Sequence, residues 1–468
     1  MHTEHLNIAI AGATGFVGRA LIDALLDDSS HHLIALSRRA FASNHPRLTV
    51  RTCDLLALDQ SETALQGADL AVYLIHAMWP QEQLRQGSFA DCDLLAADNF
   101  ARAARQAGVK RIVFLSGLQP DLPKRSLHLR SRLEVEGALA SHHVPLTVLR
   151  AGIILGAGGS SFQIFTRLVQ RFPAIPRFPE LESRTQPIAL DDTIRLLRYV
   201  IDHPVTANRT YDIGGPDVMT YTEMLEACAQ VMGLRRLKVP IPWAKAQHFG
   251  AAVSHFTHTP KELVEPLLES LAYPMVAKDH DLQDMAAFDA MPFTEALKRA
   301  LDPANAAPRP HLLPPVAPHA PKRALFAVHR LQQSPRRTAL AFAKLYMQWL
   351  PRYISPPLFA EHRPGTEVIL RVRTLGMPLL RLELDDRHTE PSSASLQVTG
   401  GLLAPQQQGR LNFRIAGAAE HGQALLAVVD GYKPLLPWEL YRFTQAPMHA
   451  RTMEAFARFL REATAKDG

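Results

Sequence analysis

The chain has 468 residues, of which 47% are hydrophobic and 21% are charged, and its formal net charge is +6. These proportions are ordinary for a folded soluble protein, and the length is sufficient for two or three domains. No stretch approaches the roughly 18 uninterrupted apolar residues of a membrane-spanning helix, and the modest charge comes without a nucleic-acid recognition module, so no nucleic-acid partner is predicted.

The cysteines and the first residues indicate the compartment. Cys53, Cys92 and Cys228 lie far apart in the chain and lack metal-ligand spacing, which predicts neither a disulfide framework nor a metal site. A strand-like run begins at Leu6 and leaves no room for a signal peptide. We therefore expect a cytoplasmic protein, and the sequence leaves its oligomeric state open.

Short apolar runs alternate with helical patterns over Leu6–Leu149, which is typical of βαβ units. Helices are expected at Phe16–Leu26, Cys92–Ala107 and Leu129–Ala140. The fold class is therefore predicted as α/β, with a doubly wound parallel Rossmann sheet. The apolar runs are Asn7–Ala11, Leu33–Leu36, Leu48–Thr52, Leu70–Ile75, Arg111–Leu115 and Leu146–Leu149.

Residues 160–300 keep a mixed character and are expected to extend this domain on its substrate side. Helical patterns at Ser161–Arg171, Asp191–Ile201 and Tyr221–Met232 are separated by loops that contain proline. The domain predicted for residues 1–300 is followed by a proline-rich linker at 301–322, whose composition favours a semi-extended chain.

Residues 323–468 are predicted to form a C-terminal α+β domain. Arg323–Leu350 is basic and is expected to be helical, and Pro437–Ala465 is expected to form a long terminal helix. Between them, alternating runs predict a largely antiparallel sheet. These runs are Thr366–Thr374, Leu379–Leu384, Ala394–Leu403, Arg410–Ile415 and Ala424–Val429.

The first of these helical segments has two interpretations. It carries basic side chains beside apolar ones, so it could lie against an anionic membrane surface and give the protein peripheral membrane contact. We prefer a helix packed between the domains. The basic residues are Arg336, Arg337, Lys344 and Arg352, and the apolar ones are Leu340, Phe342, Leu345, Tyr346 and Trp349.

A glycine-rich turn follows the first apolar run and opens the first helix. Glycine at the first position permits a tight turn, at the second lets the backbone approach a pyrophosphate, and at the third allows the helix to pack closely on the strand. The helix N-terminus then offers unpaired N–H groups to the phosphates. This predicts a nicotinamide-dinucleotide site at Gly12-Ala13-Thr14-Gly15-Phe16-Val17-Gly18.

The end of the second strand favours NADP(H) over NAD(H). NAD-preferring enzymes usually place a carboxylate there, whereas this chain has Ser37-Arg38-Arg39, and guanidinium groups pair well with a 2′-phosphate. The alternative is a pair of surface arginines on a loop. Asp54, after the third strand, suits the adenine edge, and an ordinary turn carboxylate is the alternative.

The order of these features resembles that of the extended, atypical short-chain dehydrogenase/reductase superfamily over about residues 6–235. The branch that the chain resembles most contains the dinucleotide-binding accessory subunit of respiratory complex I and bacterial proteins of which some are linked to quinone metabolism. The matching segments are Gly12–Gly18, Cys53–Leu55, Ala71–His76, Gly108–Gly117, Leu149–Gly152, Gln186–Ile188 and Tyr211–Pro216.

The resemblance implies particular site residues and one departure. Active relatives use a Tyr four residues before a Lys, with a Ser at a preceding strand end. Ser116 matches the Ser, but His128 and Arg132 stand in the other two positions. His76 falls among the cofactor-binding residues. His128 could exchange protons near neutrality, or the segment could be a helix start whose polar residues face the cofactor, with the usual catalysis lost or altered.

Two functions remain open on this sequence. One is an NADP-dependent oxidoreductase or isomerase that acts on a bulky apolar carbonyl, alcohol or quinone-like compound. The other is a cofactor-bound structural or redox-sensing protein whose C-terminal domain binds a partner or an apolar ligand. The aromatic residues that would suit an apolar ligand, or that serve as ordinary packing, are Phe172, Phe178, Trp243, Phe249 and Phe256.

Overall fold

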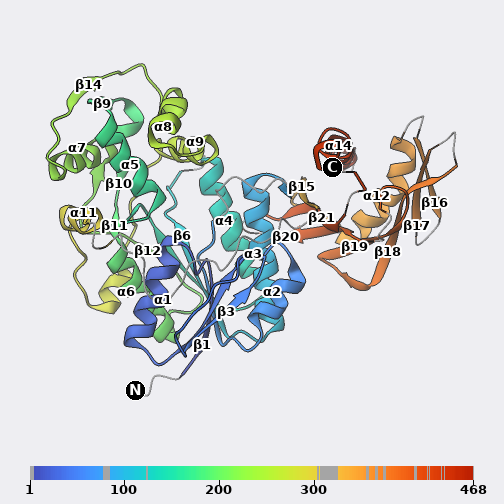
Figure 1. Ribbon diagram of the computed structural model, residues 1–468, viewed down its shortest axis with the longest axis horizontal. Helices are drawn as coiled ribbons and strands as arrows, with labels where there is room; N and C mark the ends of the chain where they lie inside the picture. The colour runs from blue at the N-terminus through green and yellow to red at the C-terminus, as the bar shows by residue number, and fades with distance from the viewer. Residues whose placement is uncertain are drawn as a thin grey trace. The chain divides into compact units, whose positions relative to one another are not determined.

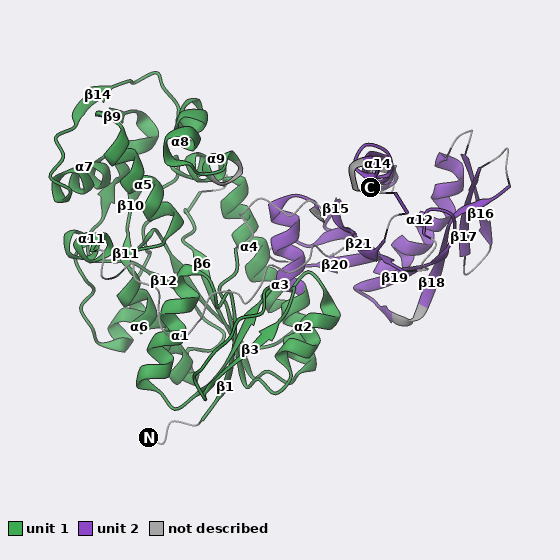
Figure 2. Cartoon of the chain, in the orientation of Figure 1, with its two compact units in different colours: residues 1–80, 99–318 green, residues 81–98, 319–468 purple. Residues whose placement is uncertain are grey.

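The chain folds into two compact units (Figure 2). Unit 1 comprises residues 1–80 and 99–318, and unit 2 comprises residues 81–98 and 319–468. The computed structural model describes residues 5–76, 85–122, 125–302, 305, 325–354, 358–363, 367–372, 376–404, 408–418, 420, 422–433, 435–436 and 438–466. The expected linker at 301–322 lies outside the described residues except for residues 301, 302 and 305.

Unit 1 is built on a seven-stranded parallel sheet, which confirms the predicted doubly wound architecture. The central strands β1, β4 and β6 are largely buried, as expected for a parallel sheet with helices on both faces. The strand order reverses between β1 and β4, which creates the switch point where doubly wound sheets bind ligands. In spatial order the strands are β3 (Leu48–Thr52), β2 (His32–Ser37), β1 (Asn7–Ala11), β4 (Leu70–Tyr73), β6 (Arg111–Gly117), β7 (Leu146–Ala151) and β12 (Thr210–Ile213).

Helices cover both faces of this sheet (Figure 1). The buried faces of α1 (Phe16–Asp28) and α6 (Leu190–Asp202) share one apolar core with the sheet. The other face carries α2 (Leu58–Leu65), α4 (Leu127–Ala140) and the unit 1 part of α3 (Phe89–Gln106). The Oγ of Ser126 caps α4 by accepting a hydrogen bond from the Leu129 amide at 3.2 Å, so the helix begins at a fixed point beside the sheet.

The substrate-side extension has its own core, formed by short strands and helices. Sequence periodicity located α5 and α7 of this extension, and also α6 on the sheet, because all three lie where helical patterns were expected. Its principal elements are α5 (Ser160–Arg171), β9 (Ala174–Arg177), α7 (Tyr221–Val231), β14 (Leu237–Pro240), η3 (Ala246–Phe249), α8 (Gly250–Thr257), α9 (Lys261–Ser270), α10 (Asp281–Ala286) and α11 (Phe293–Leu301). Shorter pieces are β8 (Ile154–Leu155), η1 (Pro179–Glu182), β10 (Arg184–Thr185), β11 (Ile188–Ala189), η2 (Pro204–Thr206) and β13 (Met219–Thr220).

Unit 2 is a mostly antiparallel sheet with a long terminal helix, as the sequence predicts. Among the described strands of unit 2, only β5 and β15 pair in parallel. In spatial order the strands are β16 (Leu358–Arg363), β17 (Glu367–Val372), β18 (Pro378–Glu390), β19 (Ser393–Gly400), β20 (Arg410–Ala416), β21 (Ala424–Tyr432), β15 (Leu325–Gln333) and β5 (Arg85–Gln86). The helices are α12 (Ala339–Tyr353), α13 (Trp438–Tyr441) and α14 (Gln445–Lys466).

The expectation that Arg323–Leu350 is helical is wrong over Leu325–Gln333, which forms β15. This strand pairs with β21 and buries Leu325 and Val328, so tertiary pairing overrides the local pattern. The helix begins only at Ala339. Its apolar residues Phe342 and Tyr346 belong to the core that α12 and α14 form with the sheet, which leaves them unavailable to a lipid surface.

In the part of the chain that the structure describes, no helix combines the length and apolar composition needed to cross a membrane.

Phe456 should be a principal support of unit 2. It is fully buried and its ring contacts Tyr346, Trp349 and Phe413. Phe456→Ala should therefore lower the free energy of unfolding by about 3–5 kcal/mol, measured by native-state hydrogen exchange in α12 and α14. The control Phe443→Ala removes a ring that is 71% exposed and should change it by less than about 0.5 kcal/mol. Equal effects of the two substitutions would contradict this account of the core.

Candidate functional site

The turn between β1 and α1 has a backbone that excludes side chains at its glycines. Gly12 has a φ of +88°, and a Cβ there would lie 3.0 Å from the carbonyl oxygen of Leu74 on the neighbouring chain segment. A Cβ on Gly18 would lie only 2.2 Å from the carbonyl oxygen of Gly12. The Gly15 amide donates to that same oxygen at 2.9 Å. Glycine at 12 therefore serves the turn, and glycine at 18 lets the helix approach the strand.

The first turn of α1 carries no protein anion. Gly15 is its N-cap and supplies no side-chain hydrogen bond, and no acidic residue lies in the first turn. Arg19 Nε donates to the Thr14 carbonyl oxygen at 2.9 Å, which holds a guanidinium against the turn. Amide groups at a helix N-terminus and a nearby cation both favour an anion. The segment Gly12–Gly18 therefore fits the pyrophosphate of a dinucleotide.

At the end of β2, one side chain makes a structural contact and the next two lie in solvent. Ser37 is buried, and its Oγ accepts from the Arg39 amide at 3.1 Å. The side chains of Arg38 and Arg39 are exposed, and neither has an ion-pair partner among the described residues. Asp54 Oδ1 accepts from the Leu56 amide at 3.3 Å, and this bond leaves both interpretations of the carboxylate open.

A cavity of about 650 Å³ lies at the carboxyl ends of the central strands of unit 1. This volume is in the range of small-molecule binding sites. Phe16 and Val17 from the start of α1 line it, together with residues of α4, α5, α8 and α9. Four polar residues gather on the Rossmann side of its wall, namely His76, Ser116, His128 and Arg132.

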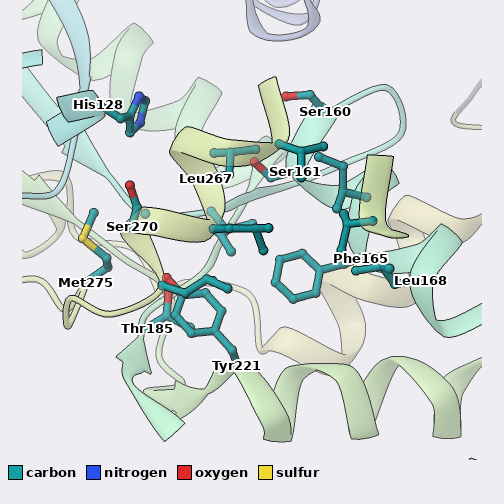
Figure 3. Close-up of a pocket in the computed structure, with 18 of the residues that line it drawn as sticks. His128, Ser160, Ser161, Phe165, Leu168, Thr185, Tyr221, Leu267, Ser270 and Met275 are labelled. Atoms are coloured by element: carbon teal, nitrogen blue, oxygen red, sulfur yellow. The ribbon is translucent and has the colours of Figure 1, made fainter. Parts of the chain in front are cut away.

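The rest of the wall is largely apolar (Figure 3). Phe172, Phe178 and Phe249 line the cavity, as an apolar ligand would require. Trp243 and Phe256, which were considered with them, do not belong to the wall. They are 80% and 40% exposed.

Three of the polar residues form a directed hydrogen-bond chain. Arg132 Nη1 lies 3.3 Å from His76 Nδ1, and His76 Nε2 lies 3.2 Å from His128 Nδ1. Because a guanidinium only donates, Nδ1 of His76 accepts and Nε2 carries the hydrogen of the neutral ring. His76 then donates to His128 Nδ1, so the hydrogen of neutral His128 sits on Nε2. The chain thus fixes both tautomers and brings together three residues that the sequence had assigned separately.

The guanidinium of Arg132 is itself held in place. Its Cζ lies 4.9 Å from the centroid of the Phe114 ring, and Nη1 is 3.4 Å from the Ile75 carbonyl oxygen. Arg132 is 3% exposed. A planar donor fixed in this way gives His76 a constant orientation.

Ser116 is engaged elsewhere. Its hydroxyl donates to Glu136 Oε1 at 2.7 Å, and Arg150 binds both oxygens of Glu136 at 3.1 and 2.6 Å. Burial alone would lower the pKa of Arg150, but the hydrogen bonds and charge of Glu136, with the charge of Asp212, raise it. Ser116 therefore supports a buried ion pair. Its hydroxyl hydrogen is bonded to Glu136, so it is not available for the role that the matching serine has in active relatives.

Sequence reasoning missed the Glu136–Arg150 pair and the polar end of the extension. Glu136 is on α4 and Arg150 is on β7, so no local spacing connects them.

In the cavity wall, the Tyr221 hydroxyl faces Thr185 (Figure 3). Burial raises the pKa of Tyr221 to about 12. This hydroxyl therefore stays protonated near neutrality and can donate a hydrogen bond.

Comparisons with known proteins agree with this geometry. Residues 12–153 match the family described as NAD(P)H-binding. The chain is 24% identical over 248 residues to subunit 9 of the alpha subcomplex of mitochondrial NADH dehydrogenase from Arabidopsis thaliana, a match that covers 51% of this chain and 61% of that subunit. It is 27% identical over 261 residues to the ceramide reductase of Caulobacter vibrioides, covering 54% of this chain and 80% of the reductase.

Among solved structures, the NADPH-dependent quinone oxidoreductase QOR2 from Escherichia coli has a similar fold, with a TM-score of 0.50 and 19% sequence identity. The similarity covers 63% of this chain and 100% of that one.

Gly18→Ala should damage the glycine turn directly. The new methyl group would meet the Gly12 carbonyl oxygen at 2.2 Å, so we expect a loss of roughly 1–3 kcal/mol in stability and weaker NADPH binding in a fluorescence titration. Gly250→Ala is the matched control, because its Cβ would lie no closer than 3.8 Å to any neighbour. Full NADPH affinity in Gly18→Ala would show that the turn does not hold the cofactor.

Proposed function

Because residues 12–153 form an NAD(P)-binding Rossmann domain related to subunit 9 of complex I and to reductases and epimerases of the short-chain dehydrogenase/reductase type, we propose that this chain is an NADP(H)-dependent oxidoreductase or isomerase. Its substrate would be a bulky apolar carbonyl, alcohol or quinone-like compound. The observation that carries the proposal is the largely apolar cavity whose Rossmann side carries the Arg132–His76–His128 hydrogen-bond chain.

NADP(H) is favoured over NAD(H) by charge at the end of β2. Arg38 and Arg39 are exposed and carry no protein counter-ion in the described residues. Guanidinium groups bind a 2′-phosphate through charge-assisted hydrogen bonds. A carboxylate, which would repel that phosphate, is absent from the Ser37-Arg38-Arg39 run.

When bound, the nicotinamide would supply or accept the hydride. The role of the protein is to stabilise the oxygen on which negative charge develops. The Nε2–H group of His128 can donate a hydrogen bond to that oxygen, since the Nδ1 side of the ring is occupied by His76. A neutral imidazole held in one tautomer is an effective electrophilic donor in a site that excludes water. His128 would thus take the place of the missing tyrosine, and His76 and Arg132 would be positioning residues.

The apolar character of the substrate follows from the cavity wall. Its extension side is formed by groups such as Phe165, Leu168 and Leu267 (Figure 3). Placing a hydrocarbon there removes apolar surface from water at about 25 cal/mol per Å². The ceramide reductase among the relatives is named for a lipid substrate, which supports the same chemical class for this chain.

A second function is favoured by the engagement of Ser116 with Glu136. If the serine and the tyrosine–lysine pair of active relatives are all unavailable, the chain could bind NADP(H) without turning it over. It would then act as a structural or redox-sensing protein whose C-terminal unit binds a partner or an apolar ligand. We propose that the protein is cytoplasmic, where its three buried cysteines, none of which forms a disulfide, stay reduced.

Arg38→Ala should weaken the binding of NADPH but not the binding of NADH. Loss of a charge-assisted contact to the 2′-phosphate should raise the Kd for NADPH roughly tenfold or more and leave the Kd for NADH within about twofold, in fluorescence titrations of both nucleotides. Arg105→Ala, an exposed arginine at the end of α3, is the control and should change neither. Equal wild-type affinity for NADPH and NADH would rule out the proposed preference.

His128→Ala should separate catalysis from binding. Using 4-deuterated NADPH and a panel of quinones and ketones, we expect deuterium in the product and a fall in kcat of about 100-fold or more, with an unchanged Kd for NADPH. Ser161→Ala alters the cavity wall outside the hydrogen-bond chain and should keep most of the activity.

The non-catalytic function predicts a different pattern. No label would appear in any product, while NADPH at one hundred times its Kd would stabilise the fold by about 2.7 kcal/mol. That stabilisation would be the same in His128→Ala and would leave the nucleotide unconsumed.

A further inference from the structure

Two segments beside the cavity contain no acidic residue, although the chain as a whole has 45 in 468 residues. They are residues 160–179, on α5 and β9, and residues 227–261, from α7 to the start of α9. Both are rich in cations. Their basic residues are Arg167, Arg171, Arg177, Arg235, Arg236, Lys238, Lys245 and Lys261.

These segments form one continuous surface of unit 1. β9 pairs with β14, with Ala174 opposite Leu237, and Phe172 contacts Phe256 on α8 with ring centroids 4.6 Å apart. Arg236 Nε donates to the Val169 carbonyl oxygen of α5 at 2.7 Å. Figure 1 shows α5, β9, β14 and α8 together at one end of the unit. We call this surface the basic rim.

Large apolar side chains stand exposed on the basic rim. Leu237 is 71% exposed, Trp243 is 80% exposed, and Val239 and Phe256 are each 40% exposed. All four residues of β14 are exposed. Apolar side chains gathered in this way on a folded protein mark a contact with another apolar phase.

The cations of the basic rim are only partly neutralised. Lys238 pairs with Glu226, Arg177 with Glu182, and Lys261 with Glu265. Arg167, Arg171 and Arg236 donate to backbone carbonyl oxygens, which leaves their charge uncompensated. Arg235 and Lys245 are exposed, and among the described residues neither has an ion-pair partner. The surface therefore presents net positive charge around its apolar side chains.

The basic rim is continuous with the cavity. Val239 is exposed and also lines the cavity, and Ile241 and Phe172 line it as well. Leu237 and Val239 point to the same side of β14, because side chains alternate along a strand. An apolar path therefore leads from the outer surface into the cavity wall.

We propose that the basic rim docks on an anionic phospholipid bilayer. Trp243, Leu237 and Val239 would enter the headgroup region, where tryptophan is favoured. Arg235 and Lys245 would contact the anionic headgroups. Aliphatic side chains among the exposed residues favour hydrocarbon over a nucleic acid. Docking stands on this surface alone, whereas a direct passage of apolar substrate from the bilayer through Val239 also rests on the proposed function.

The test is co-sedimentation of the full chain with vesicles of phosphatidylcholine, alone or with one-third phosphatidylglycerol. We expect binding only to the anionic vesicles. Each basic residue near an anionic surface contributes about 1 kcal/mol. Removing two such charges corresponds to about 30-fold, so reversing them in Arg235→Glu/Lys245→Glu should weaken partitioning about 30-fold or more. Trp243→Ser/Leu237→Ser should weaken it at least tenfold.

Matched controls alter exposed residues outside the basic rim. Arg105→Glu/Arg209→Glu makes the same change in net charge, and Val205→Ser removes an apolar side chain that is 67% exposed. Both should bind vesicles within about twofold of wild type. Circular dichroism and NADPH affinity of each variant separate a loss of docking from a loss of fold or of the proposed cofactor site.

Several results would overturn the proposal. These are no binding of the wild-type chain to anionic vesicles, equal binding to neutral vesicles, or equal loss in the charge control. Loss of binding in Arg336→Glu/Arg337→Glu alone would assign the contact to the start of α12. Binding of a single-stranded oligonucleotide without vesicle binding would assign the basic rim to nucleic acid.

Discussion

The close approach of helix α1 to strand β1 is the constraint on which the site depends. The backbone passes so near itself that a single methyl group on Gly18 would collide with the Gly12 carbonyl oxygen. Because Gly12 adopts a positive φ, the chain can turn from strand to helix within a few residues. The turn aims the unpaired amides of the helix at the switch point between β1 and β4.

One hydrogen-bond chain organises the polar residues on the Rossmann side of the cavity. His128 and Arg132 stand on the first turns of α4, and the resemblance in sequence implies that they replace the tyrosine and lysine of active relatives. Arg132 cannot lose its proton near neutrality, but as a permanent donor it orients His76, and His76 orients His128. Ser116 donates its hydrogen bond to Glu136 and so supports the ion pair of Glu136 with Arg150. Within this wall, Arg132 and His76 therefore orient His128, and Ser116 supports an ion pair.

The extension gives the Rossmann unit its distinct character. Its helices enclose an apolar cavity beside the glycine turn, and the two segments of its basic rim contain no acidic residue of their own. A polar wall, an apolar interior and a basic outer surface follow one another across a single unit. Such an order of polarity suits a ligand that is itself apolar with one reactive polar group, since each part meets a matching environment.

The amino-acid sequence by itself determined the elements whose signal is local. The six apolar runs, the glycine turn and the helices α5, α6 and α7 could be located because a buried strand, a positive φ and an amphipathic helix each leave a pattern within a few residues. It also identified His76, His128 and Arg132 as residues of interest. Only the tertiary structure decided that these three bond to one another, that Ser116 turns to Glu136, and that Leu325–Gln333 is a strand. Those outcomes depend on contacts between segments distant in the chain, and no short-range periodicity records them.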